Sequence, residues 1–326
     1  MTRETTTPTL SFVVPVFNGA GTIQSVVDGI CAGFAEMSFE IVLVNDGSND
    51  DSEEVCARLV QESSGNTILV SLSRNFGEHS AVLAGLNYAR GEYVAVLDDD
   101  DQNPPAEIAS MLGELQRRSH DVVYGHYVEK RHSLFRNLGS KFNDKMATVM
   151  LDKPRDLYLS SFKVMNRFLV DQITKYRGPY PYIDGLIYRA TRRIGQIPVE
   201  HRASSRASRY TFHSLLRLWL NMFLNFSIKP LRLSVYVGLF TACMSIFALI
   251  FIVVDKLWIT PGLTLGIPTV LGSIVLFSGI QLMMLGVVGE YLGRLYLDQT
   301  GTPQYIVRST TRRNMTGEIQ STNAKG

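Results

Sequence analysis

The chain has 326 residues, about twice the ~150 residues typical of one domain, so it can form one large domain or two smaller units. Charged residues make up 19% of the chain and the mean hydropathy is +0.06, a composition too apolar for a disordered protein. The 32 basic and 30 acidic side chains leave a net charge of only +2, which argues against bulk electrostatic binding of nucleic acid.

Short apolar runs alternate with helical periodicity over the first hundred residues. The runs at 10–16, 39–44, 67–72 and 93–97 are rich in Val, Ile and Leu and end near polar residues, which predicts four strands. Apolar residues recur between them at helical spacing, so the expected order is β-α-β-α-β-α-β. This order predicts an α/β fold with a mostly parallel sheet and helices on both faces, whose ligands bind at the carboxyl ends of the strands.

The most acidic segment follows the fourth predicted strand directly. Asp98, Asp99, Asp100 and Asp101 are consecutive, and adjacent carboxylates repel one another unless a divalent cation with oxygen ligands binds them. Mg²⁺ or Mn²⁺ bound there would leave positions open for phosphate oxygens, whereas a solvated acidic edge is the simpler alternative. The sequence has no G-x-x-x-x-G-K-[ST] loop and no G-x-G-x-x-G after the first strand, so neither a P-loop NTPase nor a dinucleotide oxidoreductase is supported.

A basic, apolar segment precedes the most hydrophobic part of the chain. Residues 202–232 contain six Lys or Arg and no Asp or Glu, together with a wide apolar face. This pattern predicts an amphipathic helix over residues 211–230 that lies in the lipid headgroup layer. An ordinary amphipathic helix packed on a soluble domain is the alternative.

Two uncharged stretches then predict a transmembrane hairpin. At 1.5 Å per residue, the 22 uncharged residues between Arg232 and Asp255 span about 33 Å, enough to cross a bilayer. The expected spans are 232–254 and 267–289, and a buried helical pair in a soluble protein is the alternative. Basic residues flank the hairpin on the side of both termini, so we expect both termini and the α/β domain to be cytoplasmic.

These patterns predict four parts of the chain and a strand near its end. The parts are a cytoplasmic α/β domain at 1–210, an interfacial helix at 211–230, two transmembrane helices within 231–290, and a cytoplasmic tail at 291–326. Residues 302–307 of the tail are typical of a short strand.

Taken together, the motifs resemble family 2 glycosyltransferases with a GT-A (Rossmann-like) fold. Within that family they are most similar to the membrane-anchored polyprenyl-phosphate glycosyltransferases, namely dolichol-phosphate mannose synthase, the GtrB-type prophage glucosyltransferases and the undecaprenyl-phosphate aminoarabinose transferase. The resemblance rests on SFVVPVFN (11–18), IVLVNDGSND (41–50), LSRNFGEHSAVLAGLNYARGEYV (72–94), LDDDDQNPPAEI (97–108) and GEYLGRLY (289–296).

The resemblance implies an inverting transferase in the cytoplasmic (inner) membrane. Such an enzyme moves a sugar from a nucleotide diphosphate sugar, here expected to be a UDP-sugar, to a polyprenyl phosphate such as undecaprenyl or dolichyl phosphate. Its cofactor would be Mg²⁺ or Mn²⁺. Relatives use a segment like the C-terminal tail in assembly, so the resemblance also implies a homo-oligomer, with a tetramer as one option.

The resemblance further assigns roles to individual residues. Those expected to bind the nucleotide sugar are Pro15, Val16, Asn18, Asp46, Gly77, Asp98 and Asp99, with Asp46 at the base. The expected metal ligands are Asp98, Asp100 and Gln102. The expected acceptor-phosphate ligands are Arg131, Arg136, Arg202, Arg206 and Arg209. The expected catalytic residues are Asp100, Asp156 and Arg136, although Asp156 is optional as a base because a phosphate acceptor is already ionised at pH 7.

The sequence departs from the family pattern at two loops. Where the family usually has Tyr-Asn-Glu after the first strand, this chain has residues 17–19, Phe-Asn-Gly, and one polar contact to the nucleotide is missing. Where many relatives place a phosphate-binding arginine, this chain has residues 125–127, Gly-His-Tyr, so Arg136 is the expected substitute. Tyr176, Tyr180, Tyr182 and Asp184 could contact sugar hydroxyls or could simply pack.

Two other functions remain as alternatives. A processive polysaccharide synthase carries a Q-x-x-R-W motif and usually more membrane spans, and this sequence has neither. A non-catalytic membrane scaffold with the same fold would have no need of the acidic cluster at the diphosphate position.

Overall fold

A computed structural model describes residues 8–63, 66–127, 159–200, 235–241, 243–244, 247, 254, 267–313 and 319–323. The chain divides into two compact units. The first unit comprises Met1–Thr211 and Gly301–Gly326, and the second comprises Phe212–Thr300.

The first half of the chain confirms the predicted alternation of strands and helices. Its strands are β1 (Leu10–Val16), β2 (Phe39–Asn45), β3 (Asn66–Leu72) and β4 (Tyr93–Val96). Its helices are α1 (Ile23–Gly33), α2 (Ser52–Glu62), α3 (Glu78–Tyr88) and α4 (Glu107–Arg118). Helix α4 shows the local signals most clearly, because it has an acidic residue in its first turn and two arginines in its last turn, which complement the helix dipole.

The remaining strands turn the parallel sheet into a mixed one. They are β5 (Val122–Tyr127), β6 (Lys163–Asn166), β7 (Ile194–Val199), β8 (Val307–Arg313) and β9 (Ile319–Asn323), and helices α6 (Arg167–Ile173) and α7 (Ile183–Ala190) lie between β6 and β7. The nine strands form one sheet in the order β7-β5-β6-β4-β1-β2-β3-β8-β9. Strand β6 is antiparallel to both neighbours, and β8 is antiparallel to β3 and β9.

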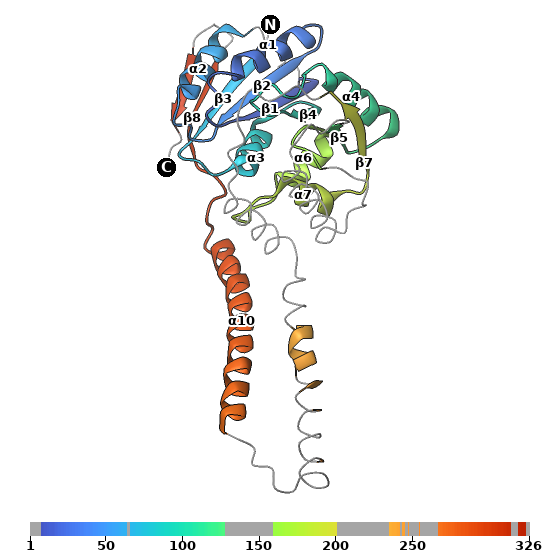
Figure 1. Ribbon diagram of the computed structural model, residues 1–326. Helices are drawn as coiled ribbons and strands as arrows, with labels where there is room; N and C mark the ends of the chain where they lie inside the picture. The colour runs from blue at the N-terminus through green and yellow to red at the C-terminus, as the bar shows by residue number, and fades with distance from the viewer. Residues whose placement is uncertain are drawn as a thin grey trace. The chain divides into compact units, whose positions relative to one another are not determined.

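Helices cover both faces of the sheet, as Figure 1 shows. On one face, α1, α2 and α4 pack on alternate strand residues such as Phe12 and Leu43 to form the main hydrophobic core. On the other face α3 lies close to β1 and β2, and Gly85 makes this approach possible because a Cβ there would lie 2.4 Å from Val13 Cγ1. The predicted α/β fold with two helical layers is therefore confirmed.

The sheet has a topological switch point beside β1. The chain runs from β1 to β2 and β3 in one direction, and β4 then pairs on the opposite edge of β1. In the parallel register Val13 pairs with Val96, and Val16 pairs with Asn45. The loops after β1, β2 and β4 therefore meet at one edge of the sheet, where ligands of such sheets bind.

The second unit contains one long described helix, α10 (Ile267–Gln299), drawn as a continuous orange helix in Figure 1. It begins where the second span was predicted to begin, but it ends at Gln299 rather than Gly289. Within it, Leu276–Gln299 is long and apolar enough to cross a membrane, the single such helix among the described residues. Residues 235–241, 243, 244, 247 and 254 of the first predicted span are helical, and the predicted interfacial helix at 211–230 lies outside the described residues.

The predicted tail strand has the wrong bounds. The strand β8 begins at Val307, and residues 302–306 precede it without regular structure. These residues are instead held by individual hydrogen bonds: Ser73 N donates to the carbonyl of Ile306 at 2.8 Å, and Gln304 Nε2 donates to the carbonyl of Tyr176 at 2.7 Å. The local sequence carries no information about the partner strand β3, so it did not place the start of the strand at Val307.

Candidate active site

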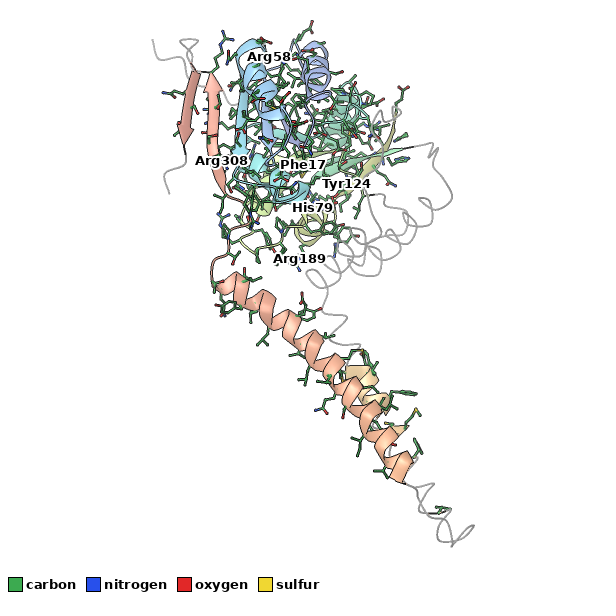
Figure 2. All side chains as sticks on the ribbon, turned by 60° about the vertical axis from the view of Figure 1, so that its left-hand side comes forward. Phe17, Arg58, His79, Tyr124, Arg189 and Arg308 are labelled. Atoms are coloured by element: carbon green, nitrogen blue, oxygen red, sulfur yellow. The ribbon has the colours of Figure 1, made fainter. Side chains whose placement is uncertain are left out.

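A pocket of about 460 Å³ lies at the carboxyl ends of β1, β2 and β4. The predicted site residues that line it are Pro15, Val16, Asp46, Gly77, Asp98, Asp99 and Asp100. Figure 2 labels three residues around this end of the sheet, Phe17 after β1, His79 in the first turn of α3 and Tyr124 on β5. The structure thus brings together residues that the sequence separates by more than eighty positions.

Asp46 fixes the loop between β3 and α3. Its two carboxylate oxygens accept hydrogen bonds from the backbone N–H groups of Phe76 at 2.7 Å and Gly77 at 2.9 Å. Its side chain is nearly buried, and this burial raises its pKa to about 6, although the two N–H groups oppose the increase. Gly77 has φ +93°, a conformation that L side chains rarely adopt. Asp46 therefore shapes the pocket wall through this loop.

Asp98 is the carboxylate most strongly perturbed by its surroundings among the aspartates after β4. Its Oδ2 accepts hydrogen bonds from Ser161 Oγ at 2.5 Å and from Asn103 Nδ2 at 3.2 Å. Burial raises the pKa of Asp98 to about 7, the negative charge of Glu78 raises it further, and the bond from Ser161 opposes both effects. Asp98 thus occupies an environment in which a negative charge is poorly compensated.

The other aspartates of the run have separate partners. Asp99 Oδ2 accepts a hydrogen bond from the backbone N–H of Phe17 at 3.1 Å. The carboxylate fits here because residue 19 is glycine, since a Cβ at this position would lie 2.3 Å from the same oxygen. Asp100 accepts hydrogen bonds from the backbone N–H and the side-chain amide of Gln102. Asp101 accepts Ser25 Oγ at 2.9 Å.

The residues present fit a divalent cation. Asp98 and Asp100 supply hard carboxylate oxygens to one pocket, and the amide of Gln102 lies against Asp100. The described residues contain no group of three or more His, Cys, Asp or Glu side chains arranged to hold an ion, so the available carboxylates are the pair Asp98 and Asp100, and the side-chain N–H of Gln102 donates to Asp100. The lining includes five carboxylates and, among the described residues, no Lys or Arg, which leaves negative charge for a cation to neutralise.

A buried ion pair lies behind the pocket. Lys163 on β6 pairs with Asp184 on α7, and Tyr124 OH donates to Asp184 Oδ1 at 2.9 Å. The positive charge of Lys163 lowers the pKa of Asp98 and so partly offsets the increase that burial causes. The ring of His79 packs edge-on against Tyr182 with centroids 4.9 Å apart, and burial lowers the pKa of His79 to about 4. His79 is therefore neutral at pH 7, as expected of a packing residue.

Several predicted residues lie elsewhere. Asn18 does not line the pocket, because its side-chain oxygen accepts the backbone N–H of Asn49 and its own N–H donates to Ser48. Gln102 touches the pocket only through Asp100. The predicted residues Arg131, Arg136, Asp156, Arg202, Arg206 and Arg209 lie outside the described residues.

The structure also adds residues that sequence reasoning missed. These lining residues are Phe17, Asn75, Glu78, Ala81 and Ser161. Phe17, Asn75, Glu78 and Ala81 lie within a few residues of predicted ones in the sequence, so their nearness to the strand ends is the signal that could have identified them. Ser161 gives no such signal, because its place depends on the insertion of β6 beside β4.

Comparison with known proteins agrees with this geometry. Residues 11–174 match the family model described as "Glycosyl transferase family 2". The chain is 28% identical over 319 residues to an undecaprenyl-phosphate 4-deoxy-4-formamido-L-arabinose transferase from Photorhabdus laumondii, covering 95% of this chain and 97% of the relative. It is 29% identical over 315 residues to the enzyme of the same name from Yersinia pestis, covering 95% and 96%.

The fold also matches a solved structure. A crystal structure of glucosyl-3-phosphoglycerate synthase from Mycobacterium tuberculosis, in complex with Mn²⁺ and UDP-glucose, aligns with a TM-score of 0.53 at 20% identity. The alignment covers 67% of this chain and 78% of that protein. At this level of identity the likeness shows a shared GT-A fold.

Proposed function

The chain belongs to glycosyl transferase family 2, and we propose that it transfers a sugar from a nucleotide diphosphate sugar, expected to be a UDP-sugar, to a polyprenyl phosphate. The acidic pocket at the switch point carries this proposal. Five carboxylates line it, so a diphosphate can enter only when a divalent cation compensates the repulsion. Asp98 and Asp100, with Gln102, would hold Mg²⁺ or Mn²⁺, which supplies positive charge to the leaving diphosphate.

The chain's own residues would position the donor. The nucleotide would lie along the loops after β1 and β2, and the β3–α3 loop fixed by Asp46 would form the wall of this part of the pocket. An oxygen of the acceptor phosphate attacks the anomeric carbon, the bond from that carbon to the diphosphate oxygen breaks, and UDP leaves. This single displacement inverts the anomeric configuration. The acceptor phosphate is already ionised, so no strong base is needed at Asp156.

The acceptor is proposed from two observations. Relatives that align along 95% of this chain are undecaprenyl-phosphate transferases, and α10 contains a segment able to cross a membrane. A long isoprenoid leaves the bilayer only at a cost of about 0.8 kcal/mol per buried methylene, so the enzyme must work at the membrane surface. The proposed location is the cytoplasmic membrane, with the catalytic domain on its cytoplasmic side and with Arg131, Arg136, Arg202, Arg206 and Arg209 near the acceptor phosphate. The proposal includes assembly of the enzyme as a homo-oligomer.

A lipid-extraction assay tests the proposal. The purified full chain in detergent is incubated with undecaprenyl phosphate, Mn²⁺ or Mg²⁺, and a panel of radiolabelled UDP-sugars. We expect chloroform-soluble label with at least one donor, loss of that label with EDTA, and its return when Mn²⁺ is added in excess. Label in an insoluble polymer would favour a processive synthase. The absence of product with every donor would favour a scaffold and contradict the proposal.

A further inference from the structure

A second, smaller pocket adjoins the active-site pocket. Its volume is about 40 Å³, and it shares Glu78 and Ser161 with the larger pocket. A cavity needs roughly 10–15 Å³ of such volume for each water molecule, so this pocket has room for about three non-hydrogen atoms. It is too small for a sugar ring but large enough for one substituent of a ring that lies in the larger pocket.

The inner wall of the small pocket is a buried ion pair. Lys163 and Asp184 both line it and are 3% and 7% exposed. The ammonium of Lys163 bonds to Asp184 Oδ1 and lies 5.1 Å from the centre of the Tyr124 ring. An ammonium has three N–H donors, and among the described residues one hydrogen-bond acceptor is present for them. A hydrogen-bond acceptor that enters the pocket would therefore meet an available, desolvated donor.

The outer wall contains a carboxylate with different properties from its neighbours. Glu78 is the first residue of α3, and its side chain lines both pockets. Asp46, Asp98 and Asp99 all accept hydrogen bonds from the surrounding protein, whereas no described residue donates one to Glu78. Glu78 is thus free to accept a hydrogen bond from a ligand. Val82, Val96 and Ile183 complete the walls with apolar surface.

We infer that the small pocket selects the donor by receiving one substituent of its sugar ring. The substituent has two or three non-hydrogen atoms and both donates and accepts hydrogen bonds, as a hydroxymethyl or a small amide group does. It donates to Glu78 and accepts from Lys163, and the apolar walls limit its size. This inference rests on the proposed function, because it requires a nucleotide sugar in the larger pocket.

Binding of donors to the full chain in detergent with Mn²⁺ tests this subsite. The affinities of UDP, UDP-glucose and UDP-xylose are measured by calorimetry, together with UDP-N-acetylglucosamine and UDP-galactose. UDP-xylose has the same ring as UDP-glucose but lacks the hydroxymethyl group, so this pair isolates one substituent. We expect Glu78→Gln to weaken the tightest-binding UDP-sugar by about tenfold to a hundredfold, because a charged acceptor is lost, and to change the affinity for UDP by less than about twofold.

A second variant tests the size limit without changing any charge. Val82 lines the small pocket, and Val82→Ile adds one carbon to its wall. We expect this variant to weaken the tightest-binding donor by about tenfold and to leave its counterpart without the substituent unchanged. Glu54→Gln is the matched control, because Glu54 is likewise an exposed glutamate in the first turn of a helix, but it lies on α2 and lines neither pocket.

The outcomes separate this inference from the proposed function. For each protein, the affinity of every UDP-sugar is divided by the affinity of UDP. If Glu78→Gln and Val82→Ile both give the same ratios as the wild type, the subsite does not exist. The same conclusion follows if the wild type binds every UDP-sugar no more tightly than UDP. If UDP-sugars bind with the expected differences but no lipid-linked product forms, the subsite stands and the assigned acceptor is wrong.

Discussion

The four consecutive aspartates after β4 differ in what their side chains contact. Asp98 and Asp100 face the pocket, and Asp99 also lines it but ties the loop to the backbone of Phe17. Asp101 has φ +57° and contacts Ser25 on α1. A left-handed residue at this position turns the chain so that successive carboxylates point to different partners. The four aspartates therefore belong to a loop of defined conformation, and substitution of each one should have a different effect.

Substitutions at two of these aspartates should have opposite outcomes. Asp100→Ala removes a proposed metal ligand, so we expect kcat/KM for transfer to fall by about 10² to 10³-fold while membrane insertion and thermal stability are unchanged. Asp101→Asn keeps the size of the side chain, and Asn tolerates a left-handed backbone, so kcat/KM should stay within about threefold of the wild type. Lipid-linked label formation at varied Mn²⁺ measures both. Wild-type activity of Asp100→Ala would show that the run is only a solvated edge.

At this scale, sequence reasoning found residues that directly follow strands. Asp98 was identifiable because it comes immediately after an apolar run that ends at the sheet edge, and Asp46 because it follows such a run after a single residue, Asn45. It did not find Ser161, which bonds to Asp98 across 63 positions of sequence. It also did not explain Gly19, where the family usually has a larger residue, although the structure does, because Asp99 occupies the space of a side chain there. Such contacts depend on loops that approach one another in three dimensions.

Helix α3 links the core to the pocket. Its first residue, Glu78, lines the pocket, and most of the following residues are buried against β1 and β2. Because Ser80–Leu86 are all buried, the helix lacks the one-sided apolar stripe of α4. The position of Glu78 therefore depends on how closely the middle of α3 packs on the sheet.

Two mid-helix glycines should respond oppositely to the same substitution. At Gly85 of α3 an added Cβ would lie 2.4 Å from Val13 Cγ1 and 3.1 Å from Val44 Cγ2, so Gly85→Ala should destabilise the catalytic unit by about 1–3 kcal/mol. At Gly113 of α4 nothing lies within 4 Å, so Gly113→Ala should stabilise it by about 0.5–1 kcal/mol through helix propensity. Thermal unfolding in detergent measures both shifts. Equal effects at the two sites would contradict the packing of α3 on β1.

The sequence predicted element bounds best where the hydrophobicity of neighbouring residues determines them. The bounds of β1 and the start of α10 follow from apolar runs, and both agree with the structure. The short strand β6 has four residues without alternation, and it forms because β4 and β5 leave a gap that an antiparallel strand fills. The predicted span ends at Gly289, before the first charged residue that follows it, whereas α10 continues to Gln299, because a helix can extend past the membrane.

At the scale of the whole molecule, the sheet is completed by residues from the far end of the chain. Strand β8 pairs with β3 over a register from Ile68–Arg312 to Leu72–Val307, and β9 pairs with β8 at the edge. Residues 301–326 of the tail, which the sequence indicated as a separate cytoplasmic part, thus belong to the first compact unit, whereas residues 291–300 belong to the second. Hydrophobic periodicity is a local property and cannot indicate that two strands more than two hundred residues apart will pair. The sequence could therefore predict a strand there but not its partner.

Two shortened chains should therefore differ in stability. A chain that stops after Arg313 loses the edge strand β9 but keeps β8, so we expect the unfolding midpoint of the catalytic unit to fall by a few degrees. A chain that stops after Gly301 also lacks β8, which exposes the buried residues Ile68, Leu69 and Val70 of β3 at an open edge. Loss of about 4 kcal/mol from this ladder would lower the midpoint by roughly 10 °C in a unit of this size.

The longer truncation should also affect the donor site, because it removes the bond between Ile306 and Ser73, next to the loop that carries Gly77 and Glu78. Thermal unfolding followed by light scattering, with Mn²⁺-dependent binding of UDP on the same samples, separates the two effects. We expect the chain ending at Gly301 to aggregate on unfolding and to bind UDP more weakly, whereas the chain ending at Arg313 binds UDP as the full chain does. Equal stability and UDP affinity in both shortened chains would mean that β8 is not an integral strand of this sheet.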